Sequence, residues 1–356
     1  MVGFYINRFL LCSNCFRDFG LRTDALRIGF HGFSKCPKCR TRDGKKLGLN
    51  ELNMLLNDFF VHGSHFKAEY GRAPLIQFNH LQETNVTFSG SLNDDARLIS
   101  ETLGIGFFHY GPRAWMFGHI TPLQDLQNLD TRPSIVNRIL EAYPADSLSP
   151  GDLIYRLRTN VAEPDNPSEY DGQPLELAGR WRLDSPGFPI LYGSQDIKVC
   201  IHECRASAED EIFVGTLSPT RQLNLLNLSH ILDEGEGVTE FESLDLAVYM
   251  LFLAGDHSYE ICREIAKAAK QRGFDGAIYP SYYSMIRTGS VPFETVYGLS
   301  HRRFVKARNY ETKKIIRNLA LFGRPVASGD LEVKCINSLT IRRADYDIRF
   351  GPARFS

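Results

Sequence analysis

Eight cysteines occur in the 356-residue chain, and four of them have the spacing of metal ligands. Cys12 and Cys15 form one Cys-x-x-Cys pair, Cys36 and Cys39 form a second, and twenty residues separate the two pairs. Four thiolates at this spacing can bind one ion tetrahedrally, and sulfur ligands favour zinc, with iron as the alternative. Four protein ligands leave no open position for water or substrate, so the predicted metal is structural.

Two other interpretations of these cysteines are weaker. Ordinary reduced cysteines seldom fall into two pairs of this kind. A thioredoxin-like redox pair needs a strand–helix–strand surrounding, which the flanking sequence lacks. The other four cysteines are scattered, as reduced thiols in an intracellular protein are. We therefore expect a zinc-ribbon-like module over residues 1–48, where little apolar core is available without a bound ion.

A second group of chemically capable residues lies in the segment GRWRLDSPGFPILYGSQDIKVCIHE. It contains Arg180, Tyr192 and Glu203, and burying such charges without a partner costs free energy. The segment is either an ion-paired structural element or the wall of a cleft for an anionic, polar ligand. Trp181 and Arg182 are expected to be structural, as a buried ring and the arginine stem that covers it.

The helix expected at the end of this segment places Glu203 beside a buried stripe. Ser194 or Asp196 can cap the helix at its N-terminus. The stripe is expected to consist of Ile197, Cys200, Ile201 and Cys204. With 3.6 residues per turn, Glu203 lies about 110° from the centre of that stripe. A glutamate there can face a cleft, and a solvated surface glutamate is the alternative.

Two strand patterns supply further candidates. LIYRLR, residues 153–158, alternates as a half-buried strand, so Arg156 and Arg158 share a face. RGFDGAIYPS ends a helix at Gly273 and continues as a strand that delivers Ser281 at its exit. From residue 149 onward, strands alternate with a few helices.

Several common active-site patterns are absent from the sequence. HECRA, from His202, begins like a zinc-protease helix, but Ala206 stands where the second histidine is required. No glycine-rich loop of the Rossmann or Walker kind occurs, so side chains would have to hold any dinucleotide. GSQD lacks the glycine-flanked nucleophile of hydrolases, and no cysteine has an adjacent histidine with an orienting partner.

Charge and pattern divide the chain into three segments. Residues 1–48 contain ten Lys or Arg and three Asp or Glu, whereas the rest contains 31 basic and 39 acidic residues. Residues 49–148 are predicted to be a mostly helical connector, and residues 149–356 a mixed domain that starts at a Ser-Pro-Gly boundary. The basic segment could bind nucleic acid, an acidic partner or the acidic body of its own chain.

Hydropathy predicts a soluble, cytoplasmic protein. No apolar run approaches the roughly twenty residues that span a bilayer. The first eleven residues lack the order of a signal peptide, because Asn7 and Arg8 interrupt the apolar run.

GRW, GFPILYGS, the helix with Glu203 and RGFDGAIYPS occur in the order seen in the RES domain, a family named for its arginine, glutamate and serine. The resemblance covers roughly residues 150–356. It implies an α+β fold similar to the diphtheria-toxin class of ADP-ribosyltransferases, with curved sheets around an NAD cleft. The segment between Ser290 and Lys314 is longer than expected for a compact member.

The resemblance also implies roles for individual residues. The family arginines, tyrosine, glutamate and serine correspond to Arg156 (with Arg158 as the alternative), Arg180, Tyr192, Glu203 and Ser281. Guanidinium groups would bind the NAD phosphates as forks. Glu203 would stabilise the oxocarbenium-like ribose that forms as nicotinamide leaves. Tyr192 and Ser281 would hold the nicotinamide or the ribose.

The function implied is NAD degradation by phosphorolysis or hydrolysis of the nicotinamide–ribose bond, in the toxin of a toxin–antitoxin or defence system. One alternative is a mono-ADP-ribosyltransferase that modifies a protein. Another is a non-catalytic regulator that binds nucleic acid, against which the intact set of Arg180, Tyr192, Glu203 and Ser281 argues. The expected partners besides NAD are an antitoxin, nucleic acid at the basic module and a second copy of the chain in a homodimer.

Overall fold

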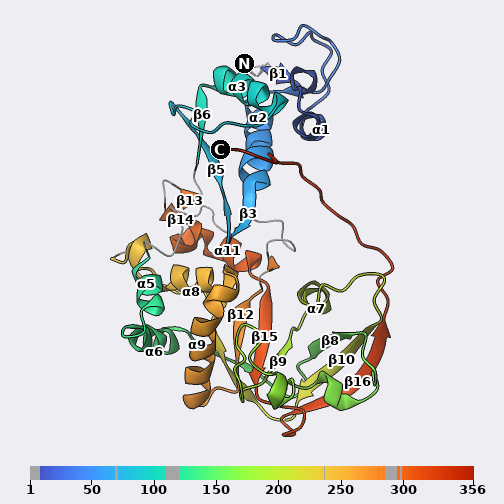
Figure 1. Ribbon diagram of the computed structural model, residues 1–356, viewed down its shortest axis with the longest axis vertical. Coiled ribbons are helices and arrows are strands. Elements are labelled where there is room, and N and C mark those ends of the chain that lie inside the picture. Colours follow the sequence, from blue (N-terminus) through green and yellow to red (C-terminus); the bar gives the residue numbers. More distant parts are fainter. Residues whose placement is uncertain are drawn as a thin grey trace, which may run out of the picture. The chain divides into compact units, whose positions relative to one another are not determined.

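The computed structural model describes residues 9–68, 71–109, 120–235, 237–281, 283–284, 295–296 and 299–356 (Figure 1). The chain divides into two compact units. Unit 1 comprises Met1–Ala68, Arg72–Trp115 and Asp345–Ser356, and unit 2 comprises Glu69–Gly71 and Met116–Ala344. The C-terminal segment therefore belongs to the same unit as the paired cysteines.

Unit 1 combines short helices with paired strands. The strands pair as β1 (Leu11–Cys12) with β2 (Lys46–Leu47), β3 (His65–Ala68) with β4 (Gly71–Pro74), and β5 (Ile76–His80) with β6 (Ile105–His109). The helices are α1 (Phe19–Ile28), α2 (Leu49–Leu55), its π-helical continuation η2 (Leu56–Val61), and α3 (Ser91–Leu103). The predicted connector thus contains strands as well as the helices expected there.

One apolar core stabilises unit 1, and it includes residues from both sides of position 48. Leu11 and Phe16 belong to the same buried cluster as Leu55, Phe60 and Phe107. The ring centroids of Phe60 and Phe107 are 4.6 Å apart. The module predicted over residues 1–48 therefore shares its core with the beginning of the predicted connector.

The last residues of the chain complete the packing of unit 1. The sequence had predicted that they belong to the domain that starts at residue 149. Ser356 and Thr87 exchange two backbone hydrogen bonds of 3.0 and 2.8 Å, and Phe355 packs against the apolar core. Gly63 and Gly351 approach so closely that a Cβ atom on either would lie 2.5 Å from the Cα of the other. This approach requires glycine at both positions.

Two sheets form the frame of unit 2. The smaller has the order β16 (Leu331–Leu339), β10 (Ile212–Pro219), β8 (Ile154–Thr159). The larger has the order β7 (Ala145–Leu148), β11 (Leu223–Asn227), β12 (Gly276–Pro280), β15 (Arg317–Phe322), β9 (Ile190–Gly193). Strands β11 and β12 are parallel, and the other pairs are antiparallel. The edges of β8 and β9 meet where Tyr155 and Ser194 exchange backbone hydrogen bonds of 2.8 and 3.1 Å.

Side chains from both sheets form the main core of unit 2. Ile154 and Leu217 of the smaller sheet lie in one buried cluster with Leu191, Ile278 and Leu319 of the larger sheet. Since neighbouring residues of a strand point to opposite faces, Tyr192, Tyr279 and Asn318 lie on the other face of the larger sheet.

Helices cover that other face (Figure 1). The helices of unit 2 are α5 (Thr121–Gln127), α6 (Arg132–Ala142), α7 (Ile197–Glu203), α8 (Leu244–Leu253), α9 (Tyr259–Gln271) and α11 (Arg308–Lys314). Helices α8 and α9 contact β12, α6 contacts α9, and α7 contacts β8. The short strands β13 (Thr295–Val296) and β14 (Leu299–Ser300) pair with each other. Helices α5 and α6 fall in the predicted connector but belong to unit 2.

The mixture of sheets and helices confirms the predicted α+β class.

Helix α8 is the most apolar of the described helices of unit 2. All ten of its residues are buried, and the ring of Phe252 stacks on Tyr279, with the ring centroids 5.4 Å apart. Within the ranges that the structure describes, no helix combines the length and the apolar character needed to cross a bilayer.

Candidate functional site

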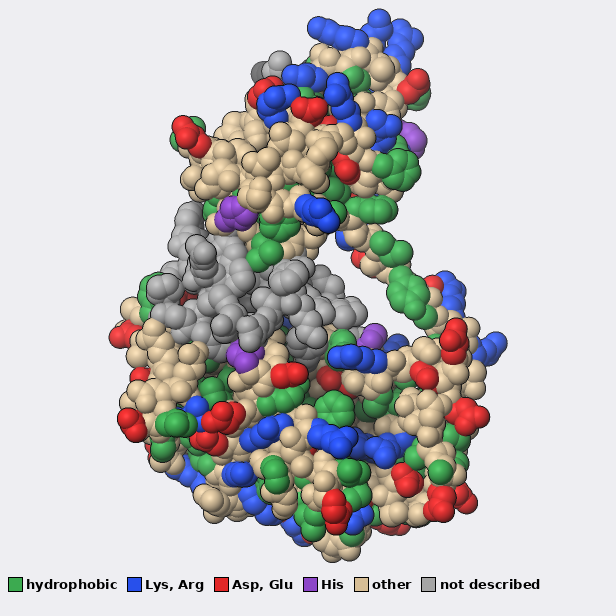
Figure 2. Space-filling view, viewed as in Figure 1, with side chains coloured by type: hydrophobic (Ala, Val, Ile, Leu, Met, Phe, Trp, Pro, Cys, Tyr) green, Lys and Arg blue, Asp and Glu red, His purple; other side chains and the backbone are tan. Residues whose placement is uncertain are grey.

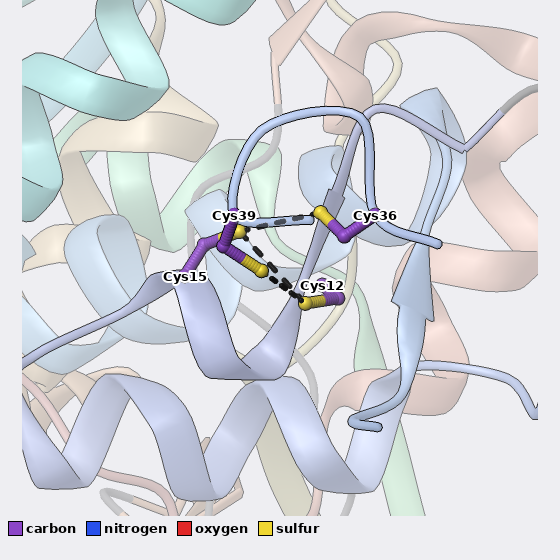
Figure 3. A group of neighbouring side chains, drawn as sticks. All are labelled: Cys12, Cys15, Cys36 and Cys39. Atoms are coloured by element: carbon purple, nitrogen blue, oxygen red, sulfur yellow. Dashed lines mark hydrogen bonds between the residues drawn. The ribbon is translucent and has the colours of Figure 1, made fainter. Parts of the chain in front are cut away.

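The four predicted ligand cysteines of unit 1 come together (Figure 3). Their Sγ atoms all lie within 4.8 Å of one another, with separations of 3.8 Å for Cys12–Cys15, 3.4 Å for Cys12–Cys39 and 3.5 Å for Cys15–Cys36. A tetrahedral zinc with Zn–S bonds of about 2.3 Å places its sulfur atoms about 3.8 Å apart. The group therefore has the geometry to hold one metal ion.

The environments of these thiols differ. Burial raises the pKa of Cys12 and Cys15. Burial acts in the same direction on Cys39, but hydrogen bonds from Thr41 and the neighbouring thiols outweigh it and lower its pKa to about 6. Metal ligation requires thiolates, so an ion entering this group would displace protons.

In unit 2, the structure places Ser281 beside Glu203. The hydroxyl of Ser281 donates to Glu203 Oε1 at 2.5 Å, and the amide Nδ2 of Asn318 donates to the same oxygen at 2.5 Å. Ser281 follows β12, Asn318 lies in β15, and Glu203 ends α7. Ser281 and Asn318 are buried, whereas the Glu203 side chain is exposed. The carboxylate is thus anchored at one oxygen and accessible from solvent.

The helix that carries Glu203 begins as predicted, and most of its expected stripe packs as predicted. Asp196 caps α7 by accepting from the backbone N–H of Lys198 at 2.8 Å. Ile197, Cys200 and Ile201 of the predicted stripe pack in one apolar cluster. Cys204 is exposed, because α7 ends at Glu203.

Asn318 is a site residue that the sequence analysis missed. It lies 115 positions from Glu203, and only the antiparallel register that pairs it with Tyr279 brings it to the site. Tyr279 is buried on the same face, and burial together with the charge of Glu203 raises its pKa. No local pattern around Asn318 indicates this role.

Tyr192 and the GRW loop are organised by a buried carboxylate. Asp184 accepts from the backbone N–H groups of Gly179, Arg180 and Trp181 at 2.5, 3.0 and 2.7 Å. Its Oδ1 also accepts from the hydroxyl of Tyr192 at 3.3 Å. Asp184 is fully buried, so these bonds fix the loop that presents Arg180, whose side chain is exposed. The sequence analysis did not single out Asp184.

The two residues beside Arg180 have different roles. Arg182 donates to the carbonyl oxygens of Leu251 and Ala254, and its guanidinium lies 4.8 Å from the ring centroid of Tyr259. This confirms its structural role. Trp181 is 58% exposed, so the expectation of a buried ring was wrong. The tight loop around Asp184 turns the indole away from the core.

Arg156 and Arg158 lie on one face of β8, but their surroundings differ. Arg156 reaches the carbonyl oxygen of Tyr192 at 2.6 Å, and burial lowers its pKa. Its Nε is a buried donor without a hydrogen-bond partner among the described residues. Arg158 lies 3.5 Å from Glu169 and is 40% exposed. Arg156 is therefore a half-buried cation whose Nε has no partner among the described residues, and Arg158 is a surface residue with a carboxylate neighbour.

Comparisons with known proteins agree with the motifs of unit 2. Residues 153–291 match the family model described as the RES domain. A chain in the crystal structure of the M. tuberculosis MbcT–MbcA toxin–antitoxin complex is similar at 16% sequence identity and a TM-score of 0.33, over 58% of this chain and 91% of that chain. No curated protein matches the sequence.

Proposed function

Starting from the RES domain at residues 153–291, we propose that unit 2 cleaves the nicotinamide–ribose bond of NAD. The observation that carries the proposal is the Glu203 carboxylate, held by Ser281 and Asn318 while its side chain stays exposed. Loss of nicotinamide leaves positive charge on the ribose, and a fixed carboxylate stabilises that charge more in the transition state than in the ground state.

The arginines of the RES domain are suited to the anionic part of NAD. Arg156 is half-buried and its Nε has no partner among the described residues, so an anion that reaches it gains a charge-assisted hydrogen bond without displacing a protein partner. Arg180 is exposed on a loop that Asp184 holds in place. We assign phosphate binding to these two residues, with Arg158 as an additional contact.

Tyr192 and Ser281 are assigned to the nicotinamide ribose. The Tyr192 hydroxyl accepts from the backbone N–H of Leu183 at 2.9 Å and donates to Asp184, so the ring has a fixed orientation. An aromatic face of this kind suits a flat heterocycle or a sugar. Ser281 donates to Glu203 and accepts from the backbone N–H of Tyr283 at 3.0 Å, which leaves one lone pair for a ribose hydroxyl.

The acceptor of the ribose is proposed to be phosphate. Glu203 is the candidate general base for water, but it is already assigned to the developing cation. Phosphate is an anion at neutral pH and needs no base, and the cationic Arg156 or Arg158 can attract it. Hydrolysis is the alternative outcome within the same site.

Product analysis tests the proposal. Purified protein is incubated with NAD, with and without inorganic phosphate, and the products are separated and identified. We expect nicotinamide in both cases and a 1-phosphorylated ADP-ribose when phosphate is present. Free ADP-ribose alone in saturating phosphate makes the enzyme a hydrolase, transfer to a protein makes it an ADP-ribosyltransferase, and no nicotinamide contradicts the proposal.

Because consumption of NAD harms a cell, we propose that the protein is a toxin restrained by an antitoxin. Expression from an inducible promoter is expected to arrest growth and to lower cellular NAD. The Glu203→Gln variant is expected to do neither at equal protein level. A homodimer remains a prediction, which light scattering of the purified chain tests.

The cysteine group of unit 1 is proposed to bind structural zinc. Around it, Lys35, Lys38, Arg40 and Arg42 are exposed, and Figure 2 shows Lys and Arg side chains gathered on this unit at the top of the view. Such a surface can bind nucleic acid through phosphates, and that binding weakens steeply with salt. Binding that does not change between low and high salt favours a protein partner instead.

A further inference from the structure

A cavity of about 140 Å3 lies in unit 2, where β11 of the larger sheet ends and β15 begins. Ser229 and His230, which follow β11, form one wall, and Arg308, Thr312 and Arg317, from α11 and the start of β15, form another. Two isoleucines complete the lining. The cavity is far larger than the space that one water molecule needs.

The charges that line this cavity are positive. Arg308 and Arg317 belong to its lining, and none of the described residues that line it carries a carboxylate. Each arginine has a carboxylate neighbour outside the lining, Asp233 at 3.3 Å from Arg308 and Asp146 at 3.4 Å from Arg317. Asp233 is 70% exposed and Asp146 40% exposed, so solvent weakens both ion pairs. The lining therefore attracts anions.

One hydrogen-bond donor in the lining lacks a partner. Arg308 Nε is buried and has no hydrogen-bond partner within the part of the chain that the structure describes. A buried donor of this kind costs free energy unless a ligand or water satisfies it. The hydroxyls of Thr312 and Ser229 already donate to the Arg308 carbonyl oxygen and to Asn227 Oδ1, at 2.8 and 2.6 Å. The unpartnered donor is thus Nε of Arg308, part of a guanidinium group whose geometry matches an oxyanion.

This cavity is separate from the Glu203 site. Arg317 and Asn318 are consecutive residues of β15, and consecutive side chains of a strand point to opposite faces. Asn318 binds Glu203 on one face, and Arg317 lines the cavity on the other. An anion in the cavity is therefore not an NAD phosphate bound at the Glu203 site.

We propose that this cavity is a second anion site, which binds a phosphate group through Arg308 and Arg317. The group is either inorganic phosphate or the phosphate of a small monoester, because both present the same oxygens to the two guanidinium forks. The proposal does not depend on NAD cleavage.

Binding is measured by isothermal calorimetry in the Glu203→Gln background, which removes NAD chemistry from the experiment. Inorganic phosphate and glycerol 3-phosphate are titrated separately at constant ionic strength. We expect at least one to bind, and Arg308→Gln together with Arg317→Gln to weaken that binding at least tenfold. The matched control is Arg272→Gln, which removes an arginine with a similar surface ion pair, 3.3 Å from Glu141. Tighter binding of the monoester identifies the phosphate as part of a larger ligand.

Hydrogen–deuterium exchange on the chain with both arginines intact keeps the test valid if the double variant fails to fold. Saturating ligand is expected to slow exchange in peptides that cover residues 228–231 and 308–317. The proposal is overturned if neither ligand binds, if the double variant binds as well as the Arg272→Gln control, or if the exchange of those peptides does not change.

Discussion

The cysteine group of unit 1 and the glutamate site of unit 2 are assembled in different ways. All four cysteines lie within 28 consecutive residues, and two short knuckles bring them together. The glutamate site joins a helix end, a strand exit and a strand interior that are spread over residues 203–318. The cysteine group is thus set by spacing within one segment, whereas the glutamate site is set by the register of distant strands.

The largest expected effect is on the metal content and folding of unit 1, with unit 2 unaffected. Cys36→Ser is expected to reduce bound zinc from about one per chain to near zero and to unfold the segment around the four cysteines, because structural zinc contributes about 10–16 kcal/mol of binding free energy in small zinc modules. Nicotinamide release by unit 2 is expected to persist. Elemental analysis and limited proteolysis measure the two effects, and Cys335→Ser, an exposed cysteine outside the group, is the control. A folded, metal-free chain with all four cysteines would contradict this account.

The next effect concerns the buried carboxylate of unit 2. Asp184→Asn is expected to destabilise unit 2 by about 2–4 kcal/mol, since it weakens several charge-assisted hydrogen bonds worth about 1.5–3 kcal/mol each. Urea denaturation followed by far-ultraviolet circular dichroism measures the loss. The KM for NAD is also expected to rise, because Arg180 and Tyr192 lose their common anchor. Unchanged stability and KM would show that Asp184 does not organise the loop.

A substitution at Asn318 tests whether sheet register orients Glu203. Asn318→Ala is expected to lower kcat about 10–100-fold with little change in KM, because Glu203 loses the amide that orients its carboxylate. Steady-state kinetics with NAD separate the two parameters. The control is Asn337→Ala, an exposed asparagine in β16. A rise in KM at constant kcat would assign Asn318 to substrate binding instead.

The smallest effect is a pH dependence in the sheet frame of unit 2. Arg221 bonds Asp275 at 2.8 Å and Asp330 at 2.7 Å. Burial opposes ionisation of both carboxyls, but hydrogen bonds outweigh it and lower the pKa of each: from Arg221 and the Asn224 backbone for Asp275, and from Ser328 and Arg221 for Asp330. A lowered folded-state pKa gives stability that is present above the unfolded value of about 3.9 and is lost as the pH falls through the folded value.

Arg221→Gln is therefore expected to lower the Tm by a few degrees at pH 7. The difference from the unsubstituted chain should shrink below about pH 4. Thermal melts between pH 7 and pH 3 measure it. A difference that stays constant over this range would mean that the carboxyls do not depend on Arg221 for their charge.

The sequence predicted the parts of the protein that local pattern controls. The doubled Cys-x-x-Cys spacing led to the cysteine group, and four ordered motifs led to the RES domain. Ser281 lies beside Glu203, as the family resemblance implied. Asn318 and Asp184 were missed because their partners are set by sheet register and by a loop that folds back on itself.

The domain boundaries show the same limit. Phe355 and Ser356 pack in unit 1 beside Thr87 and Phe88, which lie more than two hundred positions away along the chain. Only the completed core of unit 1 provides the apolar surface on which Phe355 lies.

The most direct test of the account is the rate of nicotinamide release from NAD by Glu203→Gln. The account predicts a loss on the order of 10²–10³-fold, because the neutral amide cannot stabilise the cationic ribose. Glu209→Gln removes an exposed glutamate six residues away and is expected to keep full activity. A Glu203→Gln rate within twofold of the unsubstituted protein would contradict the assignment of the active site.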